Sequence, residues 1–227
     1  MHIVSLSFDD GFRTSCLRIA EVYERFGLSG CMNVLAAPED LAADQHEWGA
    51  DRGDFVLWNE LRARGHEIMP HGYSHANKRE IGFEKAKASI LRCLDIFDEK
   101  LDGFDRRSTV FNFPFNQSTP ELEAWLPTVV RAFRTSGGGI NLLPHPGMVN
   151  LTTTGSGPEN CEEHLGSQIE ALLSQPGGWL IYNTHGLDDE GWGPIRTCYL
   201  ESLLPRLLEI ETVRILPTGV ALAEAYR

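Results

Sequence analysis

The sequence is poor in basic residues, and it has no basic cluster, no long apolar run and no paired-cysteine motif. It holds 20 Lys and Arg against 32 Asp and Glu, which gives a formal net charge of −12. Nucleic acids and anionic membranes both attract a basic surface, so we expect neither as a partner. No stretch is long and apolar enough to cross a bilayer.

Cysteine usage and the N-terminus lead to an expectation about the cellular compartment. The five cysteines are odd in number, scattered and without CxxC spacing, which predicts reduced thiols. The chain enters its first apolar run without the charged and apolar regions of a signal peptide. We therefore expect a cytoplasmic protein, with a secreted parent whose leader was trimmed as the alternative. Nothing in the sequence indicates the oligomeric state.

Apolar periodicity alternates between strand and helix along the chain. It predicts strands near 3–6, 29–36, 66–69, 108–113, 129–134, 178–184 and 213–216, and helices near 15–25, 55–64, 81–101, 158–175, 197–210 and 218–226. A capping box at 118–121 predicts a further helix start. Residues 38–54 and 137–157 are expected to be long loops, the second with a short strand at 149–151.

The alternation of strands and helices predicts the fold class. The chain has 227 residues, 42% of them hydrophobic, and shows no repeat or linker. It therefore predicts one α/β domain over residues 1–227, with a barrel-like closed sheet and an active face at the strand ends.

The first predicted strand ends in the adjacent acids Asp9 and Asp10, followed by Gly11. Two neighbouring carboxylates repel each other unless an opposite charge or a shared proton is present. Ligands bind at the carboxyl ends of strands in α/β sheets. A divalent metal held by one acid, with the other acid free as a base, would satisfy both. An ordinary Asp-Gly turn is the alternative.

Histidines follow two other predicted strands. His71 and His75 are four residues apart, a spacing that can place both imidazoles on one face of a helical turn. His185 directly follows a late strand. Two histidines and one carboxylate form a recurrent ligand set for a catalytic divalent ion. Surface or capping histidines are the alternative.

These segments together resemble a known family. SFDDG at 7–11, HGYSH at 71–75 and LIYNTH at 180–185 occur in the order and spacing of the polysaccharide deacetylases, the NodB-homology or carbohydrate esterase family 4 proteins. The resemblance extends from the first strand to the terminal helix. It implies a distorted (β/α) barrel that removes acetyl groups from N-acetylated sugars with a divalent metal.

The resemblance also implies a role for each motif residue. Asp9 would be the general base and His185 the general acid, and Asp10, His71 and His75 would bind the metal. Zn²⁺ is the expected ion, with Co²⁺, Mn²⁺ or Ni²⁺ as alternatives. Such an ion lowers the pKa of water and polarises an amide oxygen, and an imidazole titrates close enough to neutrality to protonate a leaving amine.

The chain departs from the third family motif, which normally resembles Arg-x-Pro-Tyr and whose arginine pairs with the catalytic aspartate. Asn112 stands at the arginine position, and asparagine adds no positive charge to depress the pKa of Asp9. We expect Arg134 to supply that charge, with an ordinary surface arginine as the alternative. A backbone N–H near Phe115 would complete an oxyanion site.

The fourth family motif, an Asp-x-x-Asp-Trp-like stretch that orients the acid histidine, is not visible. Asp188 and Asp189 are candidates for that role, and solvated loop acids are the alternative. Aromatic residues are candidates for a sugar-stacking wall, with core packing as the alternative. These residues are Trp48, Trp58, Trp192 and Phe115.

The predicted function is a metal-dependent hydrolase that removes an N-acetyl or other N-acyl group from an amino sugar or related carbohydrate. The motif departures indicate a divergent branch, for which a small N-acyl sugar or an oligosaccharide is the expected substrate. One alternative is a hydrolase of a non-sugar linear or cyclic amide on the same fold. The other is a non-catalytic carbohydrate-binding relative.

Overall fold

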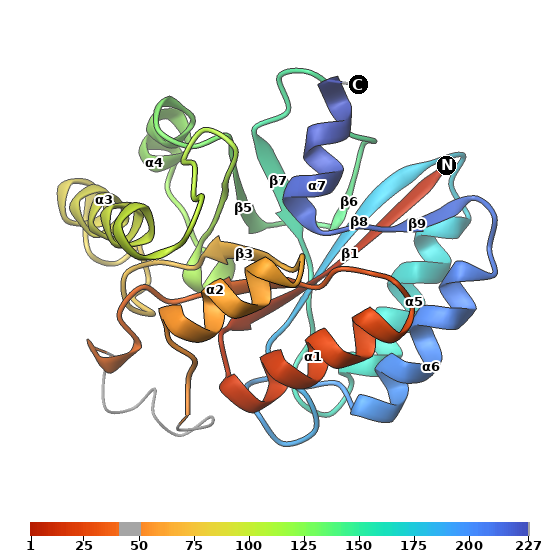
Figure 1. Cartoon of the computed structure of the whole chain (residues 1–227). Coiled ribbons are helices and arrows are strands. Elements are labelled where there is room, and N and C mark those ends of the chain that lie inside the picture. Colours follow the sequence, from red (N-terminus) through yellow and green to blue (C-terminus); the bar gives the residue numbers. More distant parts are fainter. Residues whose placement is uncertain (41–50, 227) are drawn as a thin grey trace.

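Strands and helices alternate along the chain, and the helices lie outside the strands (Figure 1). The computed structural model describes residues 1–40 and 51–226. The strands are β1 (His2–Asp10), β2 (Cys31–Val34), β3 (Glu67–Pro70), β4 (Val110–Asn112), β5 (Ala132–Ser136), β6 (Ile140–Asn141), β7 (Asn150–Thr153), β8 (Gly178–Thr184) and β9 (Val213–Ile215). The α-helices are α1 (Arg13–Arg25), α2 (Phe55–Ala63), α3 (Phe83–Lys100), α4 (Pro120–Trp125), α5 (Cys161–Leu173), α6 (Thr197–Leu208) and α7 (Thr218–Ala223).

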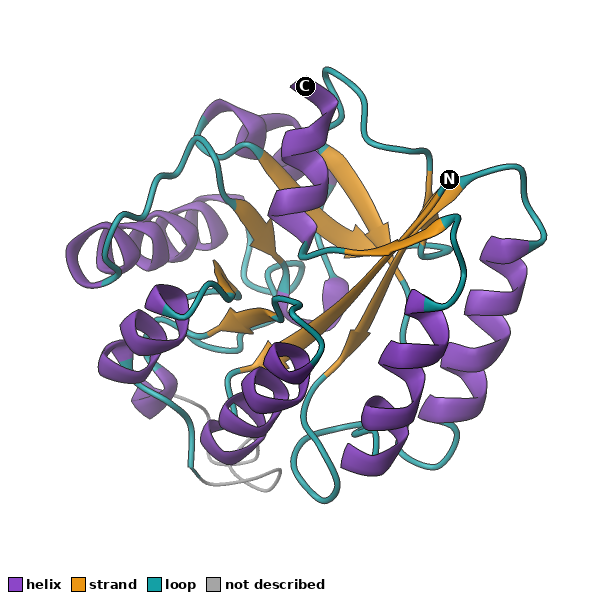
Figure 2. Cartoon of the chain, turned by 45° about the vertical axis from the view of Figure 1, so that its right-hand side comes forward, coloured by secondary structure: helices purple, strands orange, loops and turns teal. Residues whose placement is uncertain are grey.

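The strands belong to two sheets that meet at both edges. The larger sheet has the order β3-β2-β1-β8-β6, with β9 pairing the first residues of β1, and the smaller has the order β4-β5-β7. The described pairs are parallel except β6 with β8. β4 lies beside β3 and β7 lies beside β8, and a single bridge joins Thr154 to Tyr182. The two sheets therefore form one α/β domain of the distorted-barrel type (Figure 2), as the sequence predicts. In the described residues the strands are divided between two sheets instead of forming one continuously closed sheet.

β1 is the central strand, and its register places the site. All nine of its residues are buried, as expected for a parallel strand covered on both faces. Asp10 is in register with Val34 of β2, and Val34 is in register with Pro70 of β3. On the other side, Phe8 is in register with Thr184 of β8. Side chains that follow these strands therefore meet at one end of the barrel.

Several local predictions need correction. The fifth strand covers 132–136 instead of 129–134, because Leu126–Thr128 forms a 3₁₀ turn with proline in its first turn. β6 forms inside the segment 137–157 that was expected to be a loop. In the predicted loop 38–54, Pro38–Asp40 forms a 3₁₀ turn, and 41–50 lie outside the described residues.

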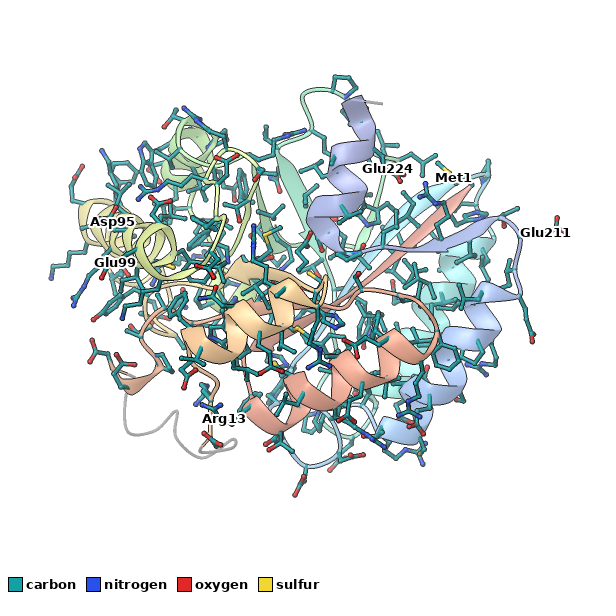
Figure 3. The ribbon with its side chains drawn as sticks, viewed as in Figure 1. Met1, Arg13, Asp95, Glu99, Glu211 and Glu224 are labelled. Atoms are coloured by element: carbon teal, nitrogen blue, oxygen red, sulfur yellow. The ribbon has the colours of Figure 1, made fainter. Side chains whose placement is uncertain are left out.

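Charged side chains such as Arg13, Asp95 and Glu211 lie at the periphery of the molecule (Figure 3).

The five cysteines are free thiols, of which only Cys198 is exposed. Within residues 1–40 and 51–226, no helix combines the length and the apolar character that crossing a membrane requires.

Candidate active site

A pocket of about 350 Å³ lies at the carboxyl ends of β1, β3 and β8. It contains most of the residues that the sequence singled out. Its lining residues are Asp9, Asp10, His71, His75, Phe115, Asn116, Gly155, Asn183, His185 and Trp192.

The end of β1 turns sharply at its second acid. Asp10 has φ 76° and Gly11 has φ 74°, so two successive residues adopt the left-handed region. Aspartate tolerates this region better than most side chains, and glycine adopts it freely. A Cβ at Gly11 would lie 3.0 Å from the buried ring of Trp58. The turn therefore depends on glycine at 11, and it directs the two carboxylates to different neighbours.

Asp10 faces both motif histidines. Its Oδ1 lies 3.4 Å from Nε2 of His71 and 3.4 Å from Nε2 of His75. Nδ1 of His71 is 3.1 Å from the carbonyl oxygen of Asn112. A carbonyl only accepts hydrogen bonds, so Nδ1 of His71 donates to it, and Nε2 is the ring nitrogen that faces Asp10. Within the described residues, Asp10 Oδ1 is buried without a hydrogen-bond partner.

The donor set fits a divalent cation. One ligand atom from each of Asp10, His71 and His75 lies within 4.8 Å of the others, and all three side chains are buried. Burial alone would raise the pKa of Asp10, but His75, His71 and His185 together hold that pKa below its ordinary value. Burial lowers the pKa of His75 to about 4, against the opposing charge of Asp10. Neutral imidazoles and an ionised carboxylate are the forms that bind a metal.

The two histidines do not share a helical turn, contrary to the expectation from their spacing. Residues 71–77 form bends and loop after β3, and Gly72 has φ 105°. The carbonyl oxygens of Gly72 and Tyr73 accept hydrogen bonds from Ala36 and Ala37, at 3.0 and 2.8 Å. This loop, anchored to the segment after β2, returns His75 toward Asp10.

Asp9 is paired with Arg134. Nη1 of Arg134 donates to Asp9 Oδ1 at 3.0 Å, and Nη2 donates to Asp9 Oδ2. Arg134 is fully buried and Asp9 is 2% exposed, so the ion pair is shielded from solvent. Burial alone would raise the pKa of Asp9, but Arg134, with His71 and His185, holds it below its ordinary value. The charge expected from Arg134 is therefore next to Asp9.

Asn112, which stands at the arginine position of the third family motif, reaches Asp9 through Asn33. Its Nδ2 donates to Oδ1 of Asn33 at 2.9 Å, and Asn33 Nδ2 in turn donates to Asp9 Oδ1 at 2.7 Å. Asn112 is in register with Arg134 of the neighbouring strand. The cation therefore reaches Asp9 from β5, one strand away from the arginine position of the family motif.

Within the described residues, the two candidate acids of the loop after His185 have other surroundings. Asp188 accepts hydrogen bonds from the backbone N–H and the hydroxyl of Thr197, at 2.9 and 2.7 Å, and Asp189 lines a separate surface pocket. Neither acid orients His185, which corrects that hypothesis. Nδ1 of His185 is buried without a hydrogen-bond partner in the described part of the chain. The His185 ring contacts Trp192 edge-on, with centroids 5.7 Å apart.

The aromatic candidates divide into two groups. Phe115 and Trp192 line the pocket and are 44% and 39% exposed, and the Phe115 ring lies 4.4 Å from that of His75. Trp58 is a core residue, 1% exposed, so it takes no part in a sugar-stacking wall. Trp48 lies outside the described residues. The oxyanion role of a backbone N–H near Phe115 stays a prediction.

Three polar or small residues at the site were missed from the sequence. Asn33 is the only polar residue of the otherwise apolar strand β2, which is a usable signal for a buried polar contact. Asn183 stands two residues before His185, inside the recognised segment 180–185. Gly155 gave no local signal of its own.

A barrel whose strand ends bring two aspartates and three histidines into one pocket has the layout of an α/β hydrolytic enzyme. Residues 1–127 match the family model described as polysaccharide deacetylase. That match covers more than half of the chain, so the chain belongs to the polysaccharide deacetylase family, whose members are amide-hydrolysing carbohydrate esterases. No curated protein sequence matches the chain.

Solved structures share the fold over nearly the whole chain. Peptidoglycan deacetylase PdaC from Bacillus subtilis is 14% identical with a TM-score of 0.61, over 99% of this chain and 91% of that one. The family 4 carbohydrate esterase from Streptomyces lividans, in complex with acetate, is 14% identical with a TM-score of 0.59, over 93% and 90%. The catalytic domain of a peptidoglycan N-acetylglucosamine deacetylase from Eubacterium rectale is 14% identical with a TM-score of 0.60, over 96% and 89%. These similarities show the NodB-type fold.

Proposed function

We propose that the chain is a metal-dependent amide hydrolase that removes an N-acetyl or other N-acyl group from an amino sugar or related small carbohydrate. The observation that supports this most directly is the convergence of His71 and His75 on Asp10 Oδ1, a buried oxygen without a hydrogen bond in the described residues. It lies beside a second carboxylate, Asp9, that is paired with an arginine. Family membership supports an amide in a carbohydrate as the reacting group.

Asp10, His71 and His75 would hold the ion. When bound, a divalent cation supplies a Lewis acid that lowers the pKa of water and polarises a carbonyl oxygen. Zn²⁺ suits two imidazoles and one carboxylate with a position left open for the substrate, and Co²⁺, Mn²⁺ or Ni²⁺ are alternatives. The hydrogen bond from His71 Nδ1 to the Asn112 carbonyl fixes the ring orientation before the ion binds.

Asp9 is proposed to accept a proton from the attacking water. The buried pair with Arg134 keeps its carboxylate ionised through the neutral range. A lower pKa also reduces the driving force for proton uptake. The pairing therefore ensures the charged form and the orientation of the base more than its strength.

His185 is proposed to donate a proton to the leaving amine nitrogen. It lines the pocket together with Asp9, and Trp192 packs edge-on against its ring. Trp192 and Phe115 form the apolar part of the pocket wall. Aromatic faces of this kind suit the apolar faces of a sugar ring and reduce the access of water.

A second candidate function is carbohydrate binding without catalysis. Its specific support is Nδ1 of His185, which is buried and has no hydrogen-bond partner in residues 1–40 and 51–226. A general acid is normally oriented by a further group. The experiment below separates this candidate from the first.

The test combines metal analysis with carboxylate release. We expect purified protein to contain about one equivalent of a divalent metal, and the double variant Asp10→Ala, His71→Ala to lose it. A matched control removes the exposed residues Asp102 and His145 and should keep the metal. The wild type should release acetate from small N-acetylated sugars. Bound metal without hydrolysis of any N-acyl substrate would favour the binding protein, and no metal even after addition of zinc would overturn the proposed ligand set.

A further inference from the structure

We propose that Asn33 is a positioning residue for Asp9 and that Asn112 fixes the orientation of Asn33. The inference rests on the proposed function, because it assigns roles around the base of that reaction. It assigns no new role to the proposed metal ligands or to His185.

Asn112 has an amide group whose orientation is fixed by the backbone. Its Nδ2 lies 3.1 Å from the carbonyl oxygen of Val110 and 3.4 Å from that of Pro70. Carbonyl oxygens only accept hydrogen bonds, so the NH₂ group of Asn112 must face them. The same NH₂ group is 2.9 Å from Oδ1 of Asn33. Asn112 therefore presents a donor to Asn33, and the oxygen of Asn33 must face it.

The orientation of Asn33 follows from that of Asn112. With its oxygen toward Asn112, its NH₂ group faces Asp9 Oδ1 at 2.7 Å and the hydroxyl oxygen of Ser7. Asn33 is fully buried, and Asn112 is 1% exposed, so water does not compete for these bonds. The chain of donors runs in one direction, from β4 through β2 to the acid at the end of β1.

The two oxygens of Asp9 consequently differ. Oδ1 accepts from Arg134 Nη1 and from Asn33 Nδ2, which occupies both of its lone pairs. Oδ2 accepts from Arg134 Nη2 and keeps one lone pair. Oδ2 is also the oxygen nearer the proposed metal site, 3.9 Å from His71 Nε2. The contact from Asn33 therefore fixes Oδ1 and leaves Oδ2 as the less hydrogen-bonded oxygen of Asp9.

The role of Asn112 toward the metal is separate from its role toward Asn33. Its backbone carbonyl holds His71, whereas its side chain holds Asn33. A side-chain substitution at 112 therefore changes the orientation of the base and leaves the ligand's hydrogen-bond acceptor in place. This separation makes the inference testable without loss of the metal.

The experiment is a kinetic double-variant cycle with Asn33→Leu, Asn112→Leu and the double variant. We expect each single variant to lower kcat about tenfold or more, since general bases contribute about 10²- to 10⁴-fold. KM and the metal content should stay within about twofold of the wild type. Because Asn112 acts through Asn33, the double variant should be no slower than Asn33→Leu alone. Asn150→Ala, which removes an exposed asparagine of β7, is the matched control.

Two results would overturn the inference. One is an unchanged kcat in folded Asn33→Leu, and the other is a double variant whose loss in kcat is the product of the two single losses. A spectroscopic readout is independent of turnover. The side-chain NH₂ resonances of Asn33 should shift on Asn112→Leu and on Asp9→Asn, and unshifted resonances would contradict the contact chain. A wild type without hydrolysis would overturn the proposed function and the catalytic part of the inference, and the spectra would still decide the orientation.

Discussion

The buried pair of Arg134 and Asp9 provides the sharpest test of the site. Arg134 is fully buried, and both of its terminal nitrogens donate to the Asp9 carboxylate. Replacing Arg134 by Met keeps much of the side-chain volume and removes the charge. Asp9 would then remain buried with Asn33 as its one donor among those described. We predict a strong loss of stability and of turnover.

The size of this loss follows from the number of bonds and their burial. Hydrogen bonds to charged groups contribute about 1.5–3 kcal/mol each, and removing one partner of a buried ion pair costs about 3–5 kcal/mol. We therefore expect Arg134→Met to lower the free energy of unfolding by about 3–5 kcal/mol. With a urea m-value of about 3 kcal/mol/M, the unfolding midpoint would fall by about 1–1.7 M.

The assay is a double-mutant cycle measured by urea unfolding, with Arg134→Met, Asp9→Asn and the double variant. Each single variant leaves one buried charge without its partner, and the double variant removes both charges. The double variant should therefore be more stable than the sum of the single losses predicts, with a coupling of about 2 kcal/mol or more. Additive losses within about 0.5 kcal/mol, or unchanged turnover in Arg134→Met, would refute the assigned pairing.

Two further predictions concern residues outside the pocket. Lys78 is fully buried, and its Nζ lies 3.2 Å from the Ser89 hydroxyl. Burial lowers its pKa from 10.5 to about 8. Below pH 8 the charge of Lys78 therefore lowers the free energy of unfolding by up to about 3 kcal/mol. Lys78→Met should therefore unfold at a higher urea concentration than the wild type at pH 7. The difference should shrink as pH rises from 8 to 10.5, because in this range the unfolded wild type binds more protons than the folded wild type, so the wild type becomes more stable. A difference that does not change with pH would contradict the role of the Lys78 charge. Asp188→Ala should lower the stability by about 1 kcal/mol through the lost contact at the start of α6. It should leave kcat and its pH profile unchanged, whereas a changed profile would mean that Asp188 acts on His185.

The residues at strand ends were predictable because their position and chemistry are both local. Asp9 and Asp10 follow an apolar run, and His185 follows another, so the parallel arrangement brings them together without further information. The path of the chain between His71 and His75 was not predictable from their spacing. It depends on Gly72 in the left-handed region and on hydrogen bonds to the segment after β2, which only the tertiary structure supplies.

The contacts of polar residues inside the barrel could not be predicted from the sequence either, because they too depend on the tertiary structure. Asn33 lies in a buried strand, and a buried amide must find partners, but its sequence neighbours do not say which. Its donor Asn112 and its acceptor Asp9 come from strands β4 and β1. The loop acid Asp188 shows the converse, since its proximity to His185 in sequence suggested a contact that its hydrogen bonds to Thr197 replace.

The positions of Asn112 and Arg134 show why the third family motif cannot be interpreted from β4 alone. The register places these residues side by side on β4 and β5, so a guanidinium from either strand can reach the carboxylate at the end of β1. On β4, asparagine replaces the motif arginine, so this strand supplies no positive charge to Asp9. Across both strands the buried cation is retained, and the asparagine adds a donor chain to the same acid. The departure from the family motif therefore relocates the charge beside Asp9 and does not remove it.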